Sequence, residues 1–224
     1  MDGNGRWAKR RDLPRIEGHK VGAERAKAVV TACRTLGVQA LTLYTFSKEN
    51  WARPKDEVSF LFDLLVKFLT SELTSLQEQD IRLRILGEPD ALPFASRQVV
   101  KLVCAKTAKN RAMTLNLALN YSGREEILQA CRKCLAAGLK PQDLTEARFR
   151  EHLYTAGQPD PDLVIRTSGE MRLSNYLTFQ SAYSELYFTD IAWPDFTEEE
   201  LHKALENYCQ RQRRFGKTGE QVSQ

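Results

Sequence analysis

Residues 2–7 combine the residue types that bind phosphate groups and a divalent cation. In Asp2-Gly3-Asn4-Gly5-Arg6-Trp7 two glycines flank an asparagine, which permits a tight turn that points several backbone N–H groups at one place. Arg6 adds a forked donor suited to phosphate. Asp2 offers a carboxylate of the kind that Mg²⁺ accepts beside substrate phosphates. The alternative is an ordinary Gly/Asn turn, and the segment is neither a Walker A loop nor G-x-G-x-x-G.

A second candidate anion site follows the apolar run LVIR at residues 163–166. The run predicts a strand that delivers Arg166 to its carboxyl end. A glycine-containing loop then brings Arg172 and Ser174 six and eight residues further along the chain. Two guanidinium groups and a hydroxyl that converge from one loop form a reasonable clamp for a diphosphate. Pairing of both arginines with surface acids fits the pattern about equally well.

Other signals leave structure and function open as alternatives. The strand-to-helix loop at residues 46–54 gathers polar and aromatic side chains that suit either helix capping or ligand binding: Ser47, Asn50, Trp51 and Arg53. His19 lies close to the first loop and is a candidate acid, base or phosphate donor. Cys131 and Cys134 form a CxxC pattern, but no second cysteine pair accompanies them, so the spacing does not favour a zinc or redox site.

The composition restricts the class of protein. The 224 residues are 42% hydrophobic and 28% charged, with a net charge of +4 and five cysteines. A charge this small argues against a dedicated nucleic-acid coat, although it is compatible with anionic ligands. Five irregularly spaced cysteines do not form a disulfide framework. No run of 18 apolar residues and no signal peptide occur, so we expect a cytoplasmic protein without a spanning segment.

Helices and strands are predicted to alternate along one domain, residues 1–224. The expected helices cover residues 21–36, 54–79, 93–110, 124–137, 145–154 and 197–215. The expected strands cover residues 38–46, 81–86, 113–119, 163–166 and 185–188. Strands separated by helices predict an α/β fold with a mostly parallel central sheet flanked by helices. Ligands of such folds bind beyond the carboxyl ends of the strands, so the loops after Phe46, Leu119 and Arg166 are the expected site.

The predicted helix at residues 54–79 has an unusually wide apolar surface. Its leucines and phenylalanines follow i, i+3, i+4 spacing, and Phe62 and Val66 extend the surface beyond one stripe. Such a surface usually means burial on two sides, which is the interpretation that the pattern favours. The alternative is that one side of this helix lines an apolar channel.

Several ordered motifs together resemble the cis-prenyltransferases, and most resemble the bacterial undecaprenyl diphosphate synthases, also called isoprenyl transferases. These motifs cover nearly the whole chain. They are DGNGRWA at 2–8, GHKVG at 18–22, FSKENWARPKDE at 46–57, DLVIRTSGEMRLSN at 162–175, AYSELYF at 182–188 and WPDF at 193–196. No DDxxD motif of the unrelated trans-type synthases is present.

The resemblance implies roles for individual residues. It implies that Asp2 and Asn50 act in catalysis and that Asp2 and Glu185 handle Mg²⁺. The residues implied to hold the allylic diphosphate are Gly3, Asn4, Gly5, Arg6, Trp7 and Arg15. Those implied to clamp isopentenyl diphosphate are Arg166, Arg172 and Ser174, with Arg214 and Gly216 reaching across a dimer. A mobile loop over the substrates matches Ser47, Asn50, Trp51, Arg53 and Glu57, and His19 matches a histidine near the diphosphate.

The resemblance also implies a reaction and partners. The expected activity is Mg²⁺-dependent, repeated cis-condensation of isopentenyl diphosphate onto an allylic diphosphate such as farnesyl diphosphate. The expected product is a long-chain polyprenyl diphosphate, a lipid carrier precursor, with a shorter product as the alternative. We expect a homodimer rather than an inert partner subunit, no nucleic acid, and transient association with the membrane surface through the lipid product. A tunnel would shield the growing chain, with Met113 near its floor.

Two departures from the family pattern are visible. Relatives carry an apolar strand directly before the DGNGR loop, whereas this sequence starts at Met1. We therefore expect the first strand of the fold to be missing from this chain, which would leave ladder groups unpaired. The second departure is Met171, which stands where some relatives have histidine, and methionine is not a ligand for hard Mg²⁺.

Overall fold

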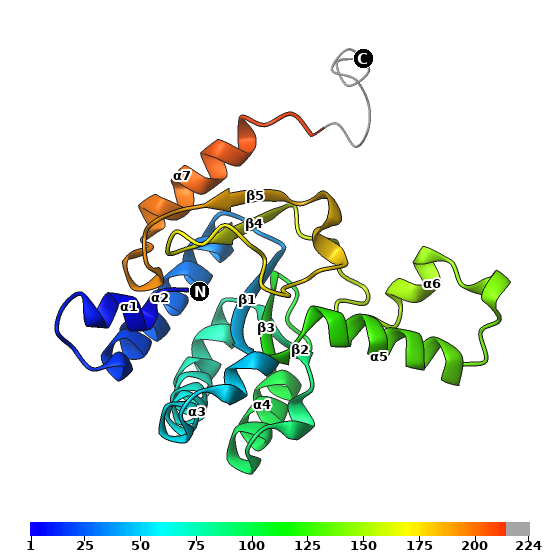
Figure 1. Cartoon of the computed structure of the whole chain (residues 1–224), viewed down its shortest axis with the longest axis horizontal. Helices are drawn as coiled ribbons and strands as arrows, with labels where there is room; N and C mark the ends of the chain where they lie inside the picture. Colours follow the sequence, from blue (N-terminus) through cyan, green and yellow to red (C-terminus); the bar gives the residue numbers. More distant parts are fainter. Residues whose placement is uncertain (214–224) are drawn as a thin grey trace.

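Three parallel strands form the larger sheet of this α/β protein (Figure 1). The computed structural model describes residues 1–213. The sheet has the order β1–β3–β2, with β1 at Ala40–Ser47, β2 at Ile81–Gly87 and β3 at Met113–Tyr121. Residue Leu117 of the central strand lies between Leu43 of β1 and Ile85 of β2. β3 is buried along almost its whole length, as expected for a central strand covered on both faces.

A second, two-stranded parallel sheet pairs β4 (Leu163–Arg166) with β5 (Glu185–Phe188). The predicted α/β fold with a parallel sheet flanked by helices is therefore confirmed, and its strands are divided between two sheets. The predicted bounds of β4 and β5 agree with the structure. In register, Arg166 lies opposite Phe188 and Leu163 lies opposite Glu185, so Arg166 and Glu185 occupy opposite ends of this short sheet.

The helices surround the two sheets. They are α1 (Asn4–Lys9), α2 (Arg15–Thr35), α3 (Lys55–Glu78), α4 (Phe94–Thr107), α5 (Gly123–Ala136), α6 (Glu146–Arg150) and α7 (Glu198–Cys209). Short 3₁₀ helices lie at η1 (Lys48–Ala52), η2 (Pro89–Ala91), η3 (Pro141–Asp143), η4 (Gln180–Tyr183) and η5 (Trp193–Asp195). Figure 1 shows α5 and α6 extending away from the larger sheet, with α1 and α2 on the opposite side.

The predicted helix and strand bounds are close to the observed ones, with four main differences, one of which is that the helix predicted for residues 197–215 ends at Cys209. Residues 4–9, predicted as a turn, form α1. The helix predicted to start at residue 21 begins at Arg15, because Pro14 is compatible with a helix start and Gly18 and Gly22 continue the helix. The helix predicted for residues 145–154 ends at Arg150.

The main core fills the space between the larger sheet and the helices α2, α3 and α4. Leu69, Ile81 and Leu119 are completely buried in it. Complete burial of one such side chain stabilises the fold by about 1.5–3 kcal/mol. The core therefore fixes α3 against the sheet, and this fixes the residues at the first turn of α3 as well.

Candidate active site

Asp2 and Arg166 join the first residues of the chain to the end of β4. Thr167 accepts a hydrogen bond from the Asp2 amide at 2.9 Å and donates one to the Asp2 carbonyl at 2.9 Å. The Asp2 carboxylate accepts from Arg166 at 3.1 Å and lies 3.3 Å from the Arg6 guanidinium. Burial alone would raise the pKa of Asp2, but the two arginines and the Gly3 amide outweigh burial and lower it. The carboxylate is therefore ionised at neutral pH.

The predicted clamp residues lie on the same side of the small sheet as Asp2. Arg166 donates to Ser174 Oγ at 2.8 Å and also bonds the Arg172 carbonyl. Arg6 reaches the same loop from α1, donating to the Ser168 carbonyl and to Glu170, each at 3.0 Å. The structure thus brings together two segments that are about 165 residues apart in sequence. Their guanidinium groups can face one anionic ligand or two adjacent ones.

A second charged cluster joins the first turns of α2 and α3. One oxygen of Glu57 lies 3.1 Å from Arg15, 3.2 Å from Arg53 and 3.3 Å from His19. Burial raises the pKa of Glu57, but these cationic neighbours outweigh burial and lower it. The pKa of His19 is also lowered, mainly by its burial. Glu57 is thus the ionised counter-ion of two arginines beside a largely neutral histidine.

Glycines allow α1 to approach α2 closely. A Cβ at Gly5 would lie 2.8 Å from the Arg15 guanidinium, so that side chain rests directly against α1. A Cβ at Gly18 would lie only 2.0 Å from the Asn4 carbonyl oxygen. Gly3 has φ 99°, a left-handed conformation that favours glycine. These contacts place Gly5 against Arg15 and Asn4 against Gly18, and binding of an allylic diphosphate by these residues stays a prediction.

Residues 47–51 form a capped 3₁₀ turn after β1. Ser47 donates its amide to Asn50 Oδ1 at 3.0 Å, and its side chain accepts from the Asn50 amide. Trp51 donates to Asn120 at 2.9 Å and packs against Phe46. Asn50 and Ser47 are therefore engaged with each other in this conformation. The structure gives the capping interpretation direct support and leaves the catalytic role of Asn50 a prediction.

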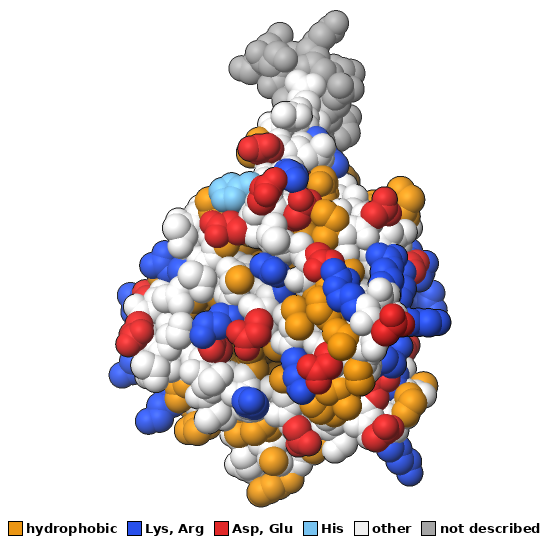
Figure 2. Space-filling model, turned by 90° about the vertical axis from the view of Figure 1, so that its left-hand side faces the viewer, with side chains coloured by type: hydrophobic (Ala, Val, Ile, Leu, Met, Phe, Trp, Pro, Cys, Tyr) orange, Lys and Arg blue, Asp and Glu red, His pale blue; other side chains and the backbone are white. Residues whose placement is uncertain are grey.

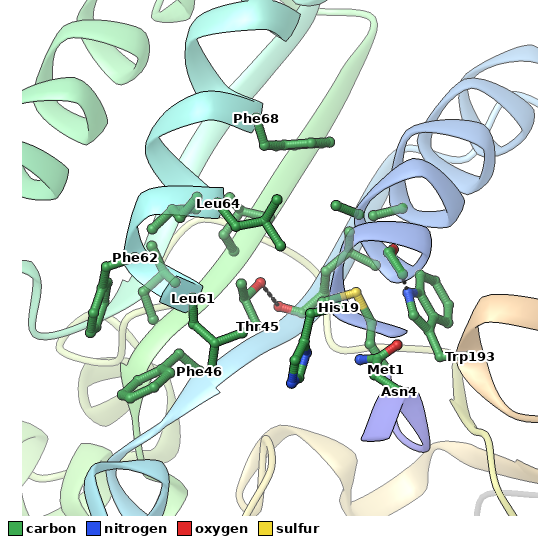
Figure 3. A pocket seen from close by; sticks show the side chains of 17 residues that line it. Met1, Asn4, His19, Thr45, Phe46, Leu61, Phe62, Leu64, Phe68 and Trp193 are labelled. Carbon is green, nitrogen blue, oxygen red and sulfur yellow. Dashed lines mark hydrogen bonds between the residues drawn. The ribbon is translucent and has the colours of Figure 1, made fainter. Parts of the chain in front are cut away.

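An apolar cavity of about 110 Å³ lies between α2, α3 and the larger sheet. Figure 3 shows Leu61, Leu64 and Phe68 reaching from α3 toward α2. Asn4 and His19 form a polar edge of the same cavity. The favoured interpretation, burial on two sides, fits residues of α3 such as Leu69 and Leu76, which are buried in the core. Leu61, Leu64 and Phe68 line the cavity, and a channel along this helix stays a prediction. Met113 is buried but is not part of the cavity lining.

Other predicted site residues have different neighbours. Trp7 donates to Asp195 at 2.6 Å. Glu185 accepts from Arg211 at 2.8 Å. Glu185 lies three register positions from Arg166, roughly 10 Å along the strands, so the structure does not bring it to Asp2 within one chain. Arg214 and Gly216 lie outside the described residues.

The surface beside α1 and α2 carries charges of both signs. Figure 2 faces this side of the molecule and shows lysines and arginines interspersed with acids, around a gathering of hydrophobic side chains. Within residues 1–213 no helix is long and apolar enough to cross a membrane. The same residues contain no cluster of three or more histidine, cysteine or acidic side chains able to hold a metal ion by themselves.

Sequence reasoning missed some contributors to the site. Thr167 fixes Asp2, and Asn120 holds Trp51. Asn120 stands at φ 48° directly at the carboxyl end of β3. Asn120 and Thr167 directly follow predicted strands, in two of the loops named above as the expected site, although neither residue was singled out. Asparagine tolerates the left-handed conformation that this position requires.

The site as a whole suits a ligand with an anionic head and an apolar tail, since Glu57 connects Arg15 and Arg53 to His19 at the polar edge of the apolar cavity. Comparison with known proteins identifies the class. The sequence model of the undecaprenyl diphosphate synthase family matches residues 1–216. The chain therefore belongs to the undecaprenyl diphosphate synthase family, and it is a prenyltransferase of the cis-prenyltransferase type.

The sequences of individual relatives align with this chain over most of their length. An isoprenyl transferase of Streptococcus agalactiae serotype V is 49% identical over 96% of this chain and 90% of its own. An isoprenyl transferase of Geobacter sulfurreducens is 47% identical over 100% of this chain and 92% of its own.

Two solved structures resemble the fold. Lavandulyl diphosphate synthase from Lavandula x intermedia, in complex with dimethylallyl diphosphate, has a TM-score of 0.94 and 37% identity, covering 97% of this chain and 95% of that one. A probable undecaprenyl diphosphate synthase from Campylobacter jejuni has a TM-score of 0.80 and 33% identity, covering 88% and 93%.

Proposed function

We propose that this prenyltransferase adds isopentenyl diphosphate repeatedly, with cis geometry, to an allylic diphosphate, for which farnesyl diphosphate is the expected primer. The product is a long-chain polyprenyl diphosphate such as undecaprenyl diphosphate. One observation carries the proposal: Arg6 and Arg166, from segments far apart in the sequence, meet beside Asp2. His19 and Asn4 lie at the edge of the apolar cavity, and Arg15 rests against Gly5, the residue after Asn4.

The charges of the site fit two diphosphates. Together the two substrates bring about six negative charges to one place, and such repulsion must be offset by cations. Arg6, Arg166 and Arg172 form one group, and Arg15 and Arg53 form another around Glu57. We assign the first group chiefly to isopentenyl diphosphate. We assign the second, with the first turn of α1, to the allylic diphosphate, since it lies at the cavity edge.

The residues present fit a magnesium ion held jointly with substrate. Mg²⁺ commonly takes one or two carboxylates, water, and substrate phosphates rather than a complete protein cage. Asp2 is ionised, partly exposed and surrounded by phosphate-binding side chains. Asp2 would hold the ion, and Glu185, which faces Arg211, is too distant to share it within one chain. When bound, the ion supplies charge stabilisation for a departing diphosphate.

The chain's own residues position the reactants and exclude water. The arginines hold the diphosphates, and Leu61, Leu64 and Phe68 surround the hydrocarbon tail. Burial of CH₂ groups contributes about 0.8 kcal/mol each, or about 4 kcal/mol for a five-carbon unit. This gain favours keeping the growing chain in the cavity between additions. We assign no residue as the base that removes the isopentenyl proton, because Ser47 and Asn50 are neutral and engaged with each other.

A shorter product is the second candidate. A cavity of about 110 Å³ is similar in size to cavities that bind a benzene-sized molecule, so in this conformation it holds about one five-carbon unit. The likeness to lavandulyl diphosphate synthase, whose structure contains the five-carbon dimethylallyl diphosphate, points the same way. A long product requires α3 to move away from α2.

The test is a direct assay of the purified protein with farnesyl diphosphate, labelled isopentenyl diphosphate and Mg²⁺. We expect butanol-extractable products with a long-chain distribution by mass spectrometry. Absence of any extractable product from farnesyl and dimethylallyl primers would refute the proposed function. Products of one or two additions would select the shorter-chain candidate. Sedimentation of the same sample tests the proposed homodimer, and flotation with vesicles after turnover tests membrane association through the lipid product.

A further inference from the structure

Asn175 connects three loops of the site, although neither the sequence pattern nor the proposed reaction gives it a role. Its side-chain amide donates to Glu49 at 2.9 Å and to Ser122 at 2.8 Å. Its Oδ1 accepts from the Arg124 amide at 2.8 Å, and its backbone carbonyl accepts from the Gly123 amide at 2.9 Å. The side chain thus uses both amide hydrogens and its oxygen, and each partner belongs to a different part of the chain from Asn175 itself.

The backbone around Asn175 explains why an asparagine stands there. Asn175 has φ 63°, and Ser174 before it has φ 49°. Asparagine tolerates this left-handed conformation better than most residues, while serine adopts it rarely. Two consecutive left-handed residues therefore depend on outside contacts to stay in place. The bonds of Asn175 to the start of α5 and to η1 supply such contacts.

The loops that Asn175 joins are the ones that carry the two proposed substrate groups. Ser174, its immediate neighbour, accepts from Arg166 in the clamp. Glu49 lies in η1, between Ser47 and Asn50, and the same segment continues to Arg53. The Asn175–Glu49 bond is a direct link between these two segments, which are separated by 126 residues in sequence.

We propose that Asn175 is a positioning residue that couples the isopentenyl diphosphate clamp to the loop after β1, so that occupation of one substrate site favours occupation of the other. This inference rests on the proposed function. A ligand that orders the 47–53 loop fixes Glu49, Glu49 fixes Asn175, and Asn175 fixes Ser174 and Arg166. In this chain of contacts Asn175 acts through Glu49 and Ser174 and does not itself touch a substrate.

The experiment measures coupling without turnover. Isopentenyl diphosphate is titrated into the protein in the presence of Mg²⁺, and its binding is measured by calorimetry. The titration is done once without and once with a saturating, non-reactive thio analogue of the allylic diphosphate. In the wild type we expect the analogue to tighten isopentenyl diphosphate binding about tenfold. That factor corresponds to about 1.4 kcal/mol, the usual size of a coupling between sites. Asn175→Gly keeps the left-handed backbone accessible and removes the side chain, and we expect the factor to fall to about one or two.

Two further variants separate positioning from folding. Glu49→Ala removes the same link from the exposed side, and we expect the same loss of coupling with an unchanged melting temperature. Asn207→Ala, on the distant helix α7 where Asn207 accepts from Arg211, is the matched control and should keep full coupling. In turnover, we expect Asn175→Gly to raise the KM for isopentenyl diphosphate about tenfold while kcat changes by less than threefold.

The outcomes are distinguishable. If the wild type binds no isopentenyl diphosphate, the proposed function fails. If the wild type binds it but shows no coupling, or if Glu49→Ala and Asn175→Gly both retain coupling, the positioning role of Asn175 is refuted. Equal losses of kcat, affinity and melting temperature in both variants would mark Asn175 as a purely structural residue and would also refute it.

Discussion

Replacement of Gly18 by alanine tests whether the close approach of α1 to α2 builds the allylic site. Gly18 is buried in α2, and an added Cβ would lie 2.0 Å from the Asn4 carbonyl oxygen and 3.3 Å from Ala8 Cβ. The obstructing atom is backbone, so it cannot swing aside as a side chain would. Helix α1 must retreat until this contact reaches the ordinary 3.4 Å, a movement of about 1.4 Å.

Two opposing effects determine the stability of Gly18→Ala. Alanine in a helix interior is favoured over glycine by about 0.5–1 kcal/mol. Overpacking of a buried contact costs about 1–3 kcal/mol. The net destabilisation should therefore be only about 0–2.5 kcal/mol. Activity should suffer far more, because a misplacement of about 1 Å in a reacting assembly costs on the order of 10²-fold in rate. We expect kcat to fall about 100-fold in a protein that remains folded.

The assay combines thermal melting with initial rates of isopentenyl incorporation. Lys20→Ala, exposed on the same helix and paired only with Glu17 among the described residues, is the control and should keep both properties. A Gly18→Ala protein with activity within threefold of the wild type would refute the reasoning, because the α1–α2 contact would then have no influence on the site. Gly18→Ser should be impaired at least as strongly.

Three further predictions concern other residues of the site. Asp2→Ala should lose at least about 100-fold in turnover, with little change in melting temperature because Asp2 is partly exposed. Its role would be contradicted if the variant and the wild type had the same kinetics over a range of Mg²⁺ concentrations. The folded-state pKa of Glu57 is lowered from 4.5, so its contribution to stability is present above pH 4.5 and is lost as the pH falls through the lower folded value. Urea titrations should therefore show a stability difference between the wild type and Glu57→Gln that shrinks below pH 4.5; a constant difference would contradict this assignment. Ala26→Leu adds bulk to the cavity lining, and it should shorten the products, as measured by mass spectrometry, with an unchanged KM for isopentenyl diphosphate; an unaltered chain-length distribution would exclude this cavity as the path of the tail.

Local patterns predicted most elements of the fold but not α1. The alternation of strands with long amphipathic helices was sufficient for β2, β4 and β5, because their apolar runs end at clear turn signals. In α1 the Gly-Asn-Gly composition indicates a turn, and contacts with α2 and η5 stabilise the helix instead. Gly18 and Gly22 likewise lower the helix propensity of α2. Because they have no side chain, Asn4 of α1 can pack closely against α2 at both positions.

The sheet order and the contacts within the charged clusters could not be predicted from local sequence patterns. The order β1–β3–β2 depends on non-local pairing, such as Leu43 with Leu117. Arg6, Arg166 and Arg172 were identifiable from residue type and loop position, whereas Arg15 followed only from the family resemblance and Arg53 was left open between capping and ligand binding. The sequence did not show that two arginines and a histidine share Glu57, because this contact depends on the relative placement of α2 and α3. Separation of Glu185 from Asp2 follows from the register of β4 with β5, which the sequence does not encode locally.

The bond between Asp2 and Arg166 spans 164 residues of sequence, and this has a consequence for how the protein is made. Contacts of such long range carry a large loop-closure cost and tend to form late in folding. During synthesis, the carboxylate emerges first and must wait until the second arginine segment has left the ribosome. An unfinished chain therefore lacks the second half of the candidate site, and the appearance of activity would report that folding has joined the two segments.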